Sequence, residues 1–219
     1  MFEIELAGRP VTLLSEKAMW LREERTLLVA DAHLGKGQSF RSLGVPVPRG
    51  SSTETLARLG ALIERTQAGR VVFLGDLLHS RYALSAAAID AALEWRERHE
   101  SVEMVLVRGN HDARAGDPPQ SLRLAVVDEP YALGGFALCH HPQAVPGRYA
   151  LAGHLHPCVS VGAGSFDRLR LACFWFGDPV THAVGVLPAF GSFTGMHPIR
   201  RRDADSVFAV AGERIARVS

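Results

Sequence analysis

The chain has 219 residues, of which 47% are hydrophobic and 21% are charged, a composition typical of a globular protein with one substantial core. We therefore expect a single domain over residues 1–219. Because 24 Lys and Arg residues nearly balance 23 Asp and Glu residues, the formal net charge is only +1, which excludes a polycation that binds nucleic acid through bulk charge.

The first half of the chain alternates apolar strand patterns with helical patterns. A hairpin is predicted over Phe2–Leu6 and Val11–Leu14, followed by a strand over Thr26–Ala30. Ser51 and Glu54 form the S-x-x-E pattern of a capping box, which predicts that a helix begins at Ser51.

The same alternation continues further along the chain. The apolar run Arg70–Leu74 predicts a strand buried on both faces, Leu84–Arg98 predicts a second helix, and Val102–Val107 predicts another strand. This order of elements is typical of an α/β layered fold with a parallel sheet, in which ligands gather at the carboxyl ends of the strands. Polar residues follow the predicted strands at those ends: Asp31, Asp76 and Asn110.

The second half of the chain has short apolar runs and few helical periodicities. These runs predict a second, largely antiparallel sheet packed on the first, with a last strand near Val207–Val210. The earlier strands of this sheet are predicted at Tyr131–Leu133, Phe136–Cys139, Tyr149–Ala152, Leu169–Phe176 and Thr181–Leu187.

The cysteines and the N-terminal segment bear on where the protein acts. Cys139, Cys158 and Cys173 are an odd number without a C-x-x-C pair, so neither a disulfide scaffold nor a zinc ribbon is expected. The N-terminus lacks a basic segment before an apolar one, and no uncharged apolar run reaches the roughly 18 residues of a membrane-spanning helix. We expect a cytoplasmic protein without a membrane partner.

Short polar clusters at the ends of apolar runs carry the chemistry. They are Asp31-Ala-His33, Gly75-Asp76, Gly109-Asn110-His111-Asp112, His140-His141 and Gly153-His154-Leu155-His156. Residues at i and i+2 of a strand point to the same face, so Asp31 with His33, and His154 with His156, are expected to present paired ligands. Together the clusters offer ligands for two metal ions about 3.5–4 Å apart, the spacing used to split phosphate esters.

The ligand types indicate which metals fit. The amide oxygen of Asn110 suits a hard or borderline cation, so manganese, iron or zinc is expected in a mixed nitrogen and oxygen site. A lone D-x-H or G-N-H-D is a weak signal, because such patterns arise by chance in loops. Their occurrence in order, each at the end of an apolar run, favours a common site.

The ordered motifs D-x-H, G-D, G-N-H-D, H and G-H-x-H resemble those of the calcineurin-like metallophosphoesterase superfamily, and the match runs from Asp31 to His156. The resemblance implies a four-layer α/β/β/α sandwich with two mixed sheets flanked by helices. It also implies the two ligand sets: Asp31, His33, Asp76 and His156 for one ion, and Asp76, Asn110, His140 and His154 for the other.

The resemblance assigns catalytic roles next to the metals. His111 would contact the substrate phosphate and help the leaving oxygen to acquire a proton, and Asp112 is a candidate to orient that imidazole. The alternative for Asp112 is a helix cap. Either His140 or His141 could be the ligand; the H-x-P form of related enzymes favours His140, which leaves His141 to face the substrate.

Longer segments carry a narrower resemblance. They are DAHLGKGQSFRSLGVPVPRG, LGDLLHS, LCHHPQAVPGRYALAGHLHPCV and LPAFGSFTG. They are similar to the bacterial ligase-associated DNA-damage-response endonucleases, which are encoded with a DNA ligase, a helicase and an exonuclease. This similarity implies an endonuclease, preferably dependent on Mn²⁺, that acts on single-stranded or distorted DNA in DNA repair, with those enzymes as functional partners.

Basic residues near the motifs are candidates to bind substrate phosphates: Lys36, Arg81, Arg114 and, in the loop before the last histidine pair, Arg148. For each of them an ordinary solvated surface charge is the alternative. The run Arg200–Arg202 could track a DNA backbone, but Asp203 and Asp205 follow at once and weaken that interpretation.

Other functions remain open at this stage. A phosphodiesterase or pyrophosphatase of small nucleotides or lipid-linked diphosphates would use the same motifs, although a lipid needs an apolar cap for which the segment between Asp112 and His140 offers little room. A catalytically inactive scaffold of the same fold is the alternative from another class. Holding carboxylates and imidazoles together without metal is costly, which argues against it.

Overall fold

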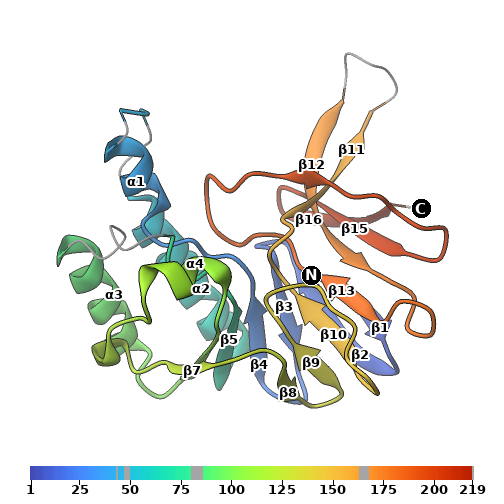
Figure 1. The fold of residues 1–219 in the computed structure, drawn as a ribbon, viewed down its shortest axis with the longest axis horizontal. Helices are drawn as coiled ribbons and strands as arrows, with labels where there is room; N and C mark the ends of the chain where they lie inside the picture. The colour runs from blue at the N-terminus through green and yellow to red at the C-terminus, as the bar shows by residue number, and fades with distance from the viewer. Residues whose placement is uncertain (43, 47–49, 80–85, 163–167, 219) are drawn as a thin grey trace.

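Two mixed β-sheets form the centre of the protein in a computed structural model (Figure 1). The structure describes residues 1–42, 44–46, 50–79, 86–162 and 168–218. The expected combination of two mixed sheets with helices is confirmed, and it has the sheet order described next.

Within the described residues the first sheet has seven strands, whose spatial order is their order in the chain. They are β1 (Phe2–Leu6), β2 (Arg9–Leu14), β3 (Ala18–Leu21), β4 (Thr26–Val29), β5 (Arg70–Leu74), β6 (Glu103–Val107) and β7 (Ala125–Val127). The strands β1 to β4 are antiparallel and β4 to β7 are parallel. Strands β3 and β7, which have four and three residues, were not predicted.

The α-helices of the described residues all lie between residues 36 and 115, on the outer side of the first sheet (Figure 1). They are α1 (Lys36–Ser42), α2 (Ser51–Thr66), α3 (Ala86–Arg98) and α4 (Asn110–Ala115), followed by the 3-10 helix η2 (Gln120–Leu122). A helical layer over the second sheet, part of the expected four-layer sandwich, has no counterpart among the described residues. The predicted start of the second helix at Leu84 falls outside the described residues.

Helix α2 begins at Ser51 as predicted, but the expected capping box is wrong. The residue at the cap position is Gly50, and no side chain caps the helix there. Ser51 is already the first helical residue, and its carbonyl accepts a hydrogen bond from Thr55 Oγ1 at 2.8 Å. The motif therefore located the helix correctly and placed the cap one residue too late.

The described part of the chain contributes nine strands to the second sheet, and the expected packing of this sheet on the first is confirmed. They are β8 (Tyr131–Leu133), β9 (Phe136–Leu138), β10 (Tyr149–Ala152), β11 (Pro157–Val161), β12 (Leu169–Phe176), β13 (Val184–Val186), β14 (His197–Pro198), β15 (Ser206–Ala211) and β16 (Arg214–Val218). The neighbours β9, β10 and β13 are parallel, whereas most other pairs are antiparallel. Strand β16 follows the strand that was expected to be the last.

Two apolar cores follow from the alternation of side chains along the central strands. In β5, Val71 and Phe73 face helices α2 and α3, while Val72 and Leu74 face the second sheet. Each fully buried side chain of this kind stabilises the fold by about 1.5–3 kcal/mol. The sheets are therefore a rigid base whose ends position the polar clusters.

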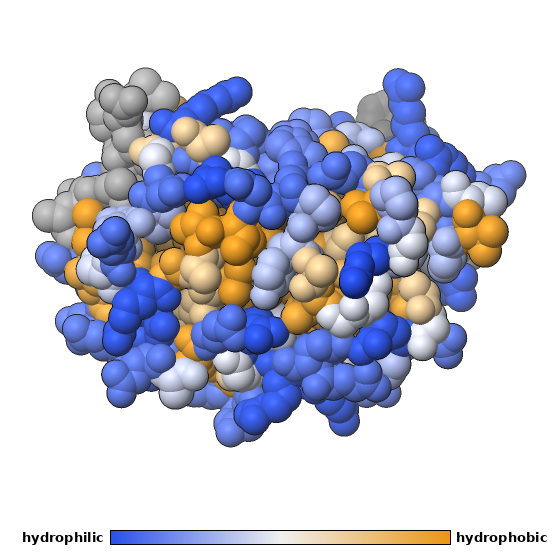
Figure 2. Space-filling model, turned by 60° about the horizontal axis from the view of Figure 1, so that its bottom comes forward, coloured by the Kyte–Doolittle hydropathy of each residue, from blue (hydrophilic) through white to orange (hydrophobic). Residues whose placement is uncertain are grey.

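The surface of the described residues carries scattered apolar side chains. On the face turned forward in Figure 2, apolar side chains show in a band that hydrophilic ones border above and below. The described helices include none with both the length and the apolar character that crossing a membrane requires. All cysteines are free and buried.

Candidate metal centre and active site

The carboxyl ends of β4, β5 and β6 bring together the first candidate ligands, as predicted from the sequence. Asp31 follows β4, Asp76 follows β5 and Asn110 opens helix α4 after β6. The backbone ties the first two segments together, because the Asp31 amide donates to the Gly75 carbonyl at 3.3 Å and the His33 amide donates to the Asp76 carbonyl at 2.9 Å. The second sheet adds His140 after β9 and His154 after β10.

Most of the candidate ligands have left-handed backbone conformations. Their positive φ values are 52° for Asp31, 46° for His33, 50° for Asp76, 68° for His154 and 47° for His156. Non-glycine residues in this conformation cost roughly 1–3 kcal/mol each and cluster at functional sites. Asp31 and His33 join the same group of ligands, as expected, although they lie in a loop and not on a strand. The expected pairing of His154 with His156 is wrong, because these two residues belong to different groups.

Two glycines are required because other groups approach them closely. A Cβ at Gly75, which has φ +76°, would lie well inside the 3.0 Å limit of real Cβ contacts from the ring of His140. A Cβ at Gly109 would meet Asp76 Oδ1 and the Asp76 amide in the same way. The glycines of the motifs G-D and G-N-H-D thus leave room for the ligands themselves.

The first group of ligands surrounds Asp31 and His33. Nε2 of His33 lies 3.4 Å from Nε2 of His156, which lies 3.6 Å from Oδ1 of Asp31. Oδ2 of Asp76 is 3.9 Å from Nε2 of His33. The ligand atoms of Asp31, His33 and His156 all lie within 4.8 Å of one another.

The second group surrounds His140, whose side chain is fully buried. Its Nε2 atom lies 2.9 Å from Oδ1 of Asn110, 3.1 Å from Nδ1 of His154 and 3.5 Å from Oδ1 of Asp76. Asp76 therefore presents one carboxylate oxygen to each group. This is the arrangement that a carboxylate bridging two ions needs.

Hydrogen bonds show that these ring nitrogens fit a cation. Nδ1 of His140 lies 3.1 Å from the Leu74 carbonyl and must donate to it, so in the neutral ring Nε2 has a lone pair facing the amide oxygen of Asn110. Nδ1 of His156 donates to the Gly195 carbonyl at 3.1 Å, which leaves Nε2 facing His33 in the same state. The lone pair of His140 Nε2 and the amide oxygen of Asn110 repel each other, and a bound cation would remove that repulsion.

Electrostatics favour the neutral forms of two of the candidate ligands, His33 and His154. Burial, with the nearby positive charge of Lys36 and the neighbouring histidines, lowers the pKa of His33 to about 2. Burial also lowers the pKa of His154. Histidines that bind a metal must be neutral, and burial favours that state for His33 and His154. The donor set of imidazoles, carboxylates and one amide fits divalent ions such as manganese, iron or zinc.

His111 lies beside both groups, with its Nε2 atom 4.0 Å from Oδ2 of Asp76. Its Nδ1 atom donates to the carbonyl of His79 at 2.9 Å, which fixes the ring and leaves Nε2 for proton exchange. The proposed orienting role of Asp112 does not match this geometry, because the ring partner is the His79 carbonyl. The buried Asp112 carboxylate accepts from the amides of Gly109 and Leu78, both at 3.0 Å, so it caps α4 and fixes the two motif loops.

Two further side chains at the site were not found from the sequence. The ring of His79 stacks on that of His111 with centroids 5.2 Å apart, and burial with the Lys36 charge lowers the pKa of His79 to about 4. The signal for it was its place in the stretch LGDLLHS, three residues after Asp76. Glu129 accepts from Nδ1 of His141 at 2.8 Å and from the His140 amide at 2.7 Å; no sequence motif marks it.

The choice between His140 and His141 is supported by their surroundings. His140 is buried among the other ligands, whereas the His141 side chain is 45% exposed and is held by Glu129 at the edge of the site. The interaction with His141 lowers the pKa of Glu129, although burial acts in the opposite sense. A ring nitrogen of His141 also lies within 4.8 Å of those of His140 and His154, and contact of His141 with a substrate stays a prediction.

The basic residues expected to bind substrate differ in position. Lys36 is half-buried at the start of α1, close enough to Asp31 and Asp76 that their charges counteract the lowering of its pKa by burial. Arg114 is exposed on α4, Arg81 lies outside the described residues, and Arg148 donates to the Gly134 carbonyl at 2.9 Å, a structural role. Arg200–Arg202 are exposed. The backbone amide of Arg202 and the indole Nε1 of Trp175 both donate to Oδ2 of Asp205.

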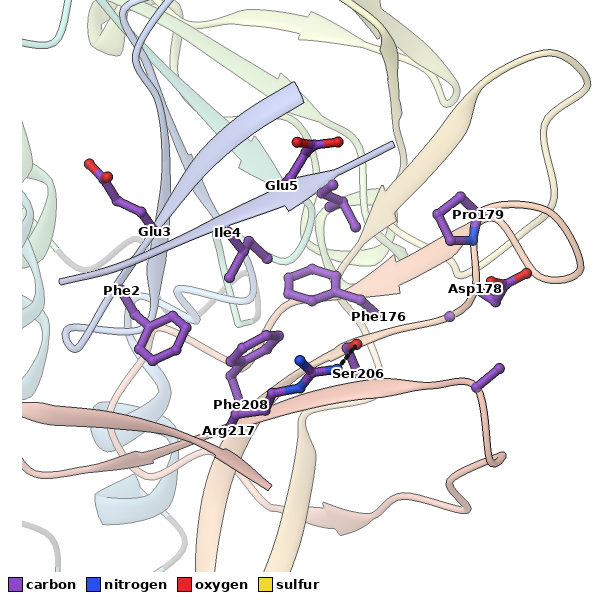
Figure 3. Close-up of a pocket in the computed structure, with 13 residues that line it drawn as sticks. Phe2, Glu3, Ile4, Glu5, Phe176, Asp178, Pro179, Ser206, Phe208 and Arg217 are labelled. Atoms are coloured by element: carbon purple, nitrogen blue, oxygen red, sulfur yellow. Dashed lines mark hydrogen bonds between the residues drawn. The ribbon is translucent and has the colours of Figure 1, made fainter. Parts of the chain in front are cut away.

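A cavity of about 460 Å³ lies elsewhere, between β1 and strands β15 and β16. Figure 3 shows Phe2, Phe176 and Phe208 in its wall, with Arg217 near Ser206. We call it the aromatic cavity. It contains none of the candidate ligands, so its volume does not make it the active site.

Comparison with known families shows which family the chain belongs to. The sequence model described as calcineurin-like phosphoesterase matches residues 24–197. The chain belongs to the calcineurin-like phosphoesterase family. The matched segment of this phosphoesterase contains all of the candidate metal ligands, from Asp31 to His156.

Solved structures similar to this phosphoesterase include the Pseudomonas putida nuclease MPE, which is 39% identical with a TM-score of 0.86. The match covers 99% of this chain and 99% of that chain. Yfce, a phosphoesterase from E. coli, is 17% identical with a TM-score of 0.41, covering 88% of this chain and 97% of that one. No match is found among curated proteins.

Proposed function

We propose that this calcineurin-like phosphoesterase is a binuclear, manganese-dependent phosphodiesterase that cleaves DNA, with single-stranded or distorted DNA as its substrate and DNA repair as its role. One observation carries the proposal: Asp76 presents its two oxygens to two groups of ligands, with His111 beside both. Because Asp31 and Asp76 are the carboxylates of this set, two divalent ions would leave a net positive site that attracts a phosphodiester anion.

The ligands divide between the two ions as the loops arrange them. Asp31, His33 and His156 would hold one ion, and Asn110, His140 and His154 the other, with Asp76 shared. The chemistry that divalent ions supply in such a site is Lewis acidity toward the phosphoryl oxygens and an activated water nucleophile. The chain holds the two carboxylates in fixed positions. Asp31 accepts a hydrogen bond from the His154 amide at 2.9 Å, and Asp76 accepts one from the His111 amide at 2.8 Å.

His111 is the group that handles the leaving oxygen. Its Nδ1 proton is committed to the His79 carbonyl, so Nε2 is the atom that donates a proton to the departing alkoxide. When Nε2 is protonated the ring is also a cation beside the phosphate. General acids of this kind contribute about 10²–10⁴-fold to rate.

The choice of DNA is supported by two observations. The nuclease MPE of Pseudomonas putida matches the whole chain in structure. The net charge of +1 agrees with local rather than bulk binding of a polyanion. We also propose functional association with a DNA ligase, a helicase and an exonuclease, which would be tested by DNA-damage sensitivity of single and double deletions of the genes.

The experiment uses purified protein stripped of metal and reloaded with Mn²⁺, Fe²⁺ or Zn²⁺. With Mn²⁺ it should hydrolyse bis-p-nitrophenyl phosphate and nick single-stranded DNA faster than duplex DNA. A cyclic nucleotide and a lipid-linked diphosphate serve as rival substrates in the same assay. Preference for either rival, or no hydrolysis with any metal, would contradict the proposal.

A further inference from the structure

A small cleft adjoins the metal centre on the side of His156. It has a volume of about 150 Å³, room for about five water molecules at roughly 30 Å³ each, and therefore for one phosphate group. We call it the Lys17 cleft. It is lined by Lys17, His156 and the segment Gly191–Met196.

The topology of the first sheet brings Lys17 to this place. Lys17 lies in the turn between β2 and β3, and its amide donates to the Leu14 carbonyl at 2.9 Å. Strand β3 is antiparallel to β4, with Met19 opposite Leu28. The start of β3 is therefore at the same edge of the sheet as the end of β4, where Asp31 begins the metal centre.

The opposite wall of the cleft is fixed to two metal-ligand loops. The amides of Phe190 and Gly191 donate to the carbonyls of Ala30 and Asp31 at 2.8 and 3.1 Å. At the other end of the segment, the Gly195 carbonyl accepts from Nδ1 of His156 at 3.1 Å. The cleft is thus held in a set position relative to the metal centre.

The charge in the cleft lacks a counter-ion. Among the described residues Lys17 has no ion-pair partner, and Arg58 lies near enough that its charge adds to burial in lowering the pKa of Lys17 to about 8. The ammonium is still mostly protonated at pH 7. Arg58 itself donates to the Phe190 carbonyl and stacks on the Phe190 ring at 4.3 Å. Arg58 has the carboxylates of Glu54 and Glu16 nearby, which counteract the lowering of its pKa by burial. Among the described groups that shift the pKa of Lys17 there is no acid, so an anion in the cleft would stabilise this half-buried ammonium.

An aromatic ring stands at the rim of the cleft. Phe193 is 47% exposed and has a φ of 59°, a left-handed conformation that is uncommon for a bulky residue. Exposed aromatic rings next to a cationic groove are the usual means of binding a single nucleic-acid strand, since every base has a face that stacks.

We propose that the Lys17 cleft binds the phosphate adjacent to the scissile phosphodiester of a DNA strand, with Lys17 as its counter-ion and Phe193 stacking on the neighbouring base. This inference rests on the proposed function and extends it to substrate length. It predicts that a strand needs a second phosphate, on one side of the scissile bond, for tight binding.

The test compares Lys17→Gln with the wild type on a single-stranded oligonucleotide and on bis-p-nitrophenyl phosphate, which has no flanking phosphate. The ratio of the two kcat/KM values should fall about tenfold, mainly through KM, and Lys17→Arg should restore most of it. The salt dependence of oligonucleotide KM should become shallower, by about 0.7 in the log–log slope. Phe193→Ala should lower the same ratio about fivefold.

Arg22→Gln is the matched control, because the substitution removes one positive charge, as Lys17→Gln does. Arg22 follows the other end of β3, and its side chain is 74% exposed. This substitution should leave the ratio unchanged. An unchanged ratio in Lys17→Gln, or an equal drop in Arg22→Gln, would overturn the inference. The proposed function would still stand if the wild type cleaves DNA. A wild type that hydrolyses the small diester but no oligonucleotide overturns both.

Discussion

The metal centre and the aromatic cavity differ in what lines them and in how the chain builds them. The cavity has a volume of about 460 Å³, and much of its wall consists of side chains from regular strands, such as Ile4 and Phe208 (Figure 3). The metal centre is built from loops at strand ends, with left-handed ligands and glycines that other groups crowd. Backbone strain with converging ligands, rather than empty volume, marks the functional site.

Removal of the shared carboxylate should break the metal centre most severely. Asp76→Ala takes away the oxygens that face both ligand groups, and metal ions contribute several kcal/mol to transition-state stabilisation, so hydrolysis of bis-p-nitrophenyl phosphate should fall roughly 10³-fold. Asp117→Ala removes an exposed carboxylate paired with Arg108 and should retain full activity. Full activity of Asp76→Ala would refute the shared-ligand arrangement.

Removal of the proton donor should spare the metals. His111→Ala keeps the backbone amide that holds Asp76, so metal content measured by atomic emission should be unchanged, while DNA nicking falls about 10²–10⁴-fold. Hydrolysis of bis-p-nitrophenyl phosphate should fall less, because p-nitrophenolate departs without a proton. Equal losses on both substrates, or loss of metal, would assign His111 another role.

A single methyl group should distinguish crowding at the metal centre from ordinary glycine effects. Gly109→Ala places a Cβ against Asp76 and should weaken Mn²⁺ binding about 10–100-fold, as displaced supporting groups do in metal sites. The control is Gly69→Ala, whose Cβ would meet nothing within 4 Å. Titration calorimetry gives both affinities, and comparable values for the two variants would show that the crowding is without consequence.

Stability of the metal-free protein should depend on pH through His33. Its folded pKa of about 2 lies below the usual value of about 6.5, so below pH 6.5 the unfolded chain binds a proton that the folded chain does not. The free energy of unfolding should therefore fall as pH is lowered from 6.5, by up to about 1.4 kcal/mol per pH unit. Urea titrations in EDTA from pH 8 to 5 should show a steeper decline for the wild type than for His33→Asn; parallel curves would contradict the burial effect.

The smallest effect is expected at the aromatic cavity. Arg217→Ala removes an exposed guanidinium that contacts Ser206 at 3.3 Å, so the free energy of unfolding should change by about 0.5 kcal/mol or less. Hydrolysis of bis-p-nitrophenyl phosphate should stay within experimental error of the wild type. A tenfold loss of activity would mean that the cavity communicates with the metal centre.

The sequence was sufficient to locate the parallel strands and the ligands that follow them. Apolar runs such as Arg70–Leu74 end at polar residues, and because carboxyl ends of parallel strands meet at one edge, Asp31, Asp76 and Asn110 were expected together. Their neighbours in the second sheet, His140 and His154, were also expected as ligands from clusters at the ends of apolar runs, but only the resemblance to a family divided the ligands between two ions.

The local geometry was beyond the sequence because tertiary contacts determine it. Strand spacing suggested that His154 and His156 share a face, yet left-handed backbones direct them to different ligand groups. Asp112 was an open choice between capping and catalysis until the amides of Gly109 and Leu78 were found at its oxygens. Glu129 precedes β8 and His141 follows β9, so their contact depends on the pairing of these two strands, which no local pattern encodes.

The central claim is that two metal ions share Asp76 at the carboxyl ends of β4, β5 and β6. Electron paramagnetic resonance of the Mn²⁺-loaded wild type tests it most directly, with metal content measured on the same sample. We expect two ions per chain with the spectrum of a spin-coupled pair about 3.5–4 Å apart, and loss of the coupling in Asp76→Ala. One ion per chain, or the spectrum of isolated Mn²⁺ ions in the wild type, would contradict the account.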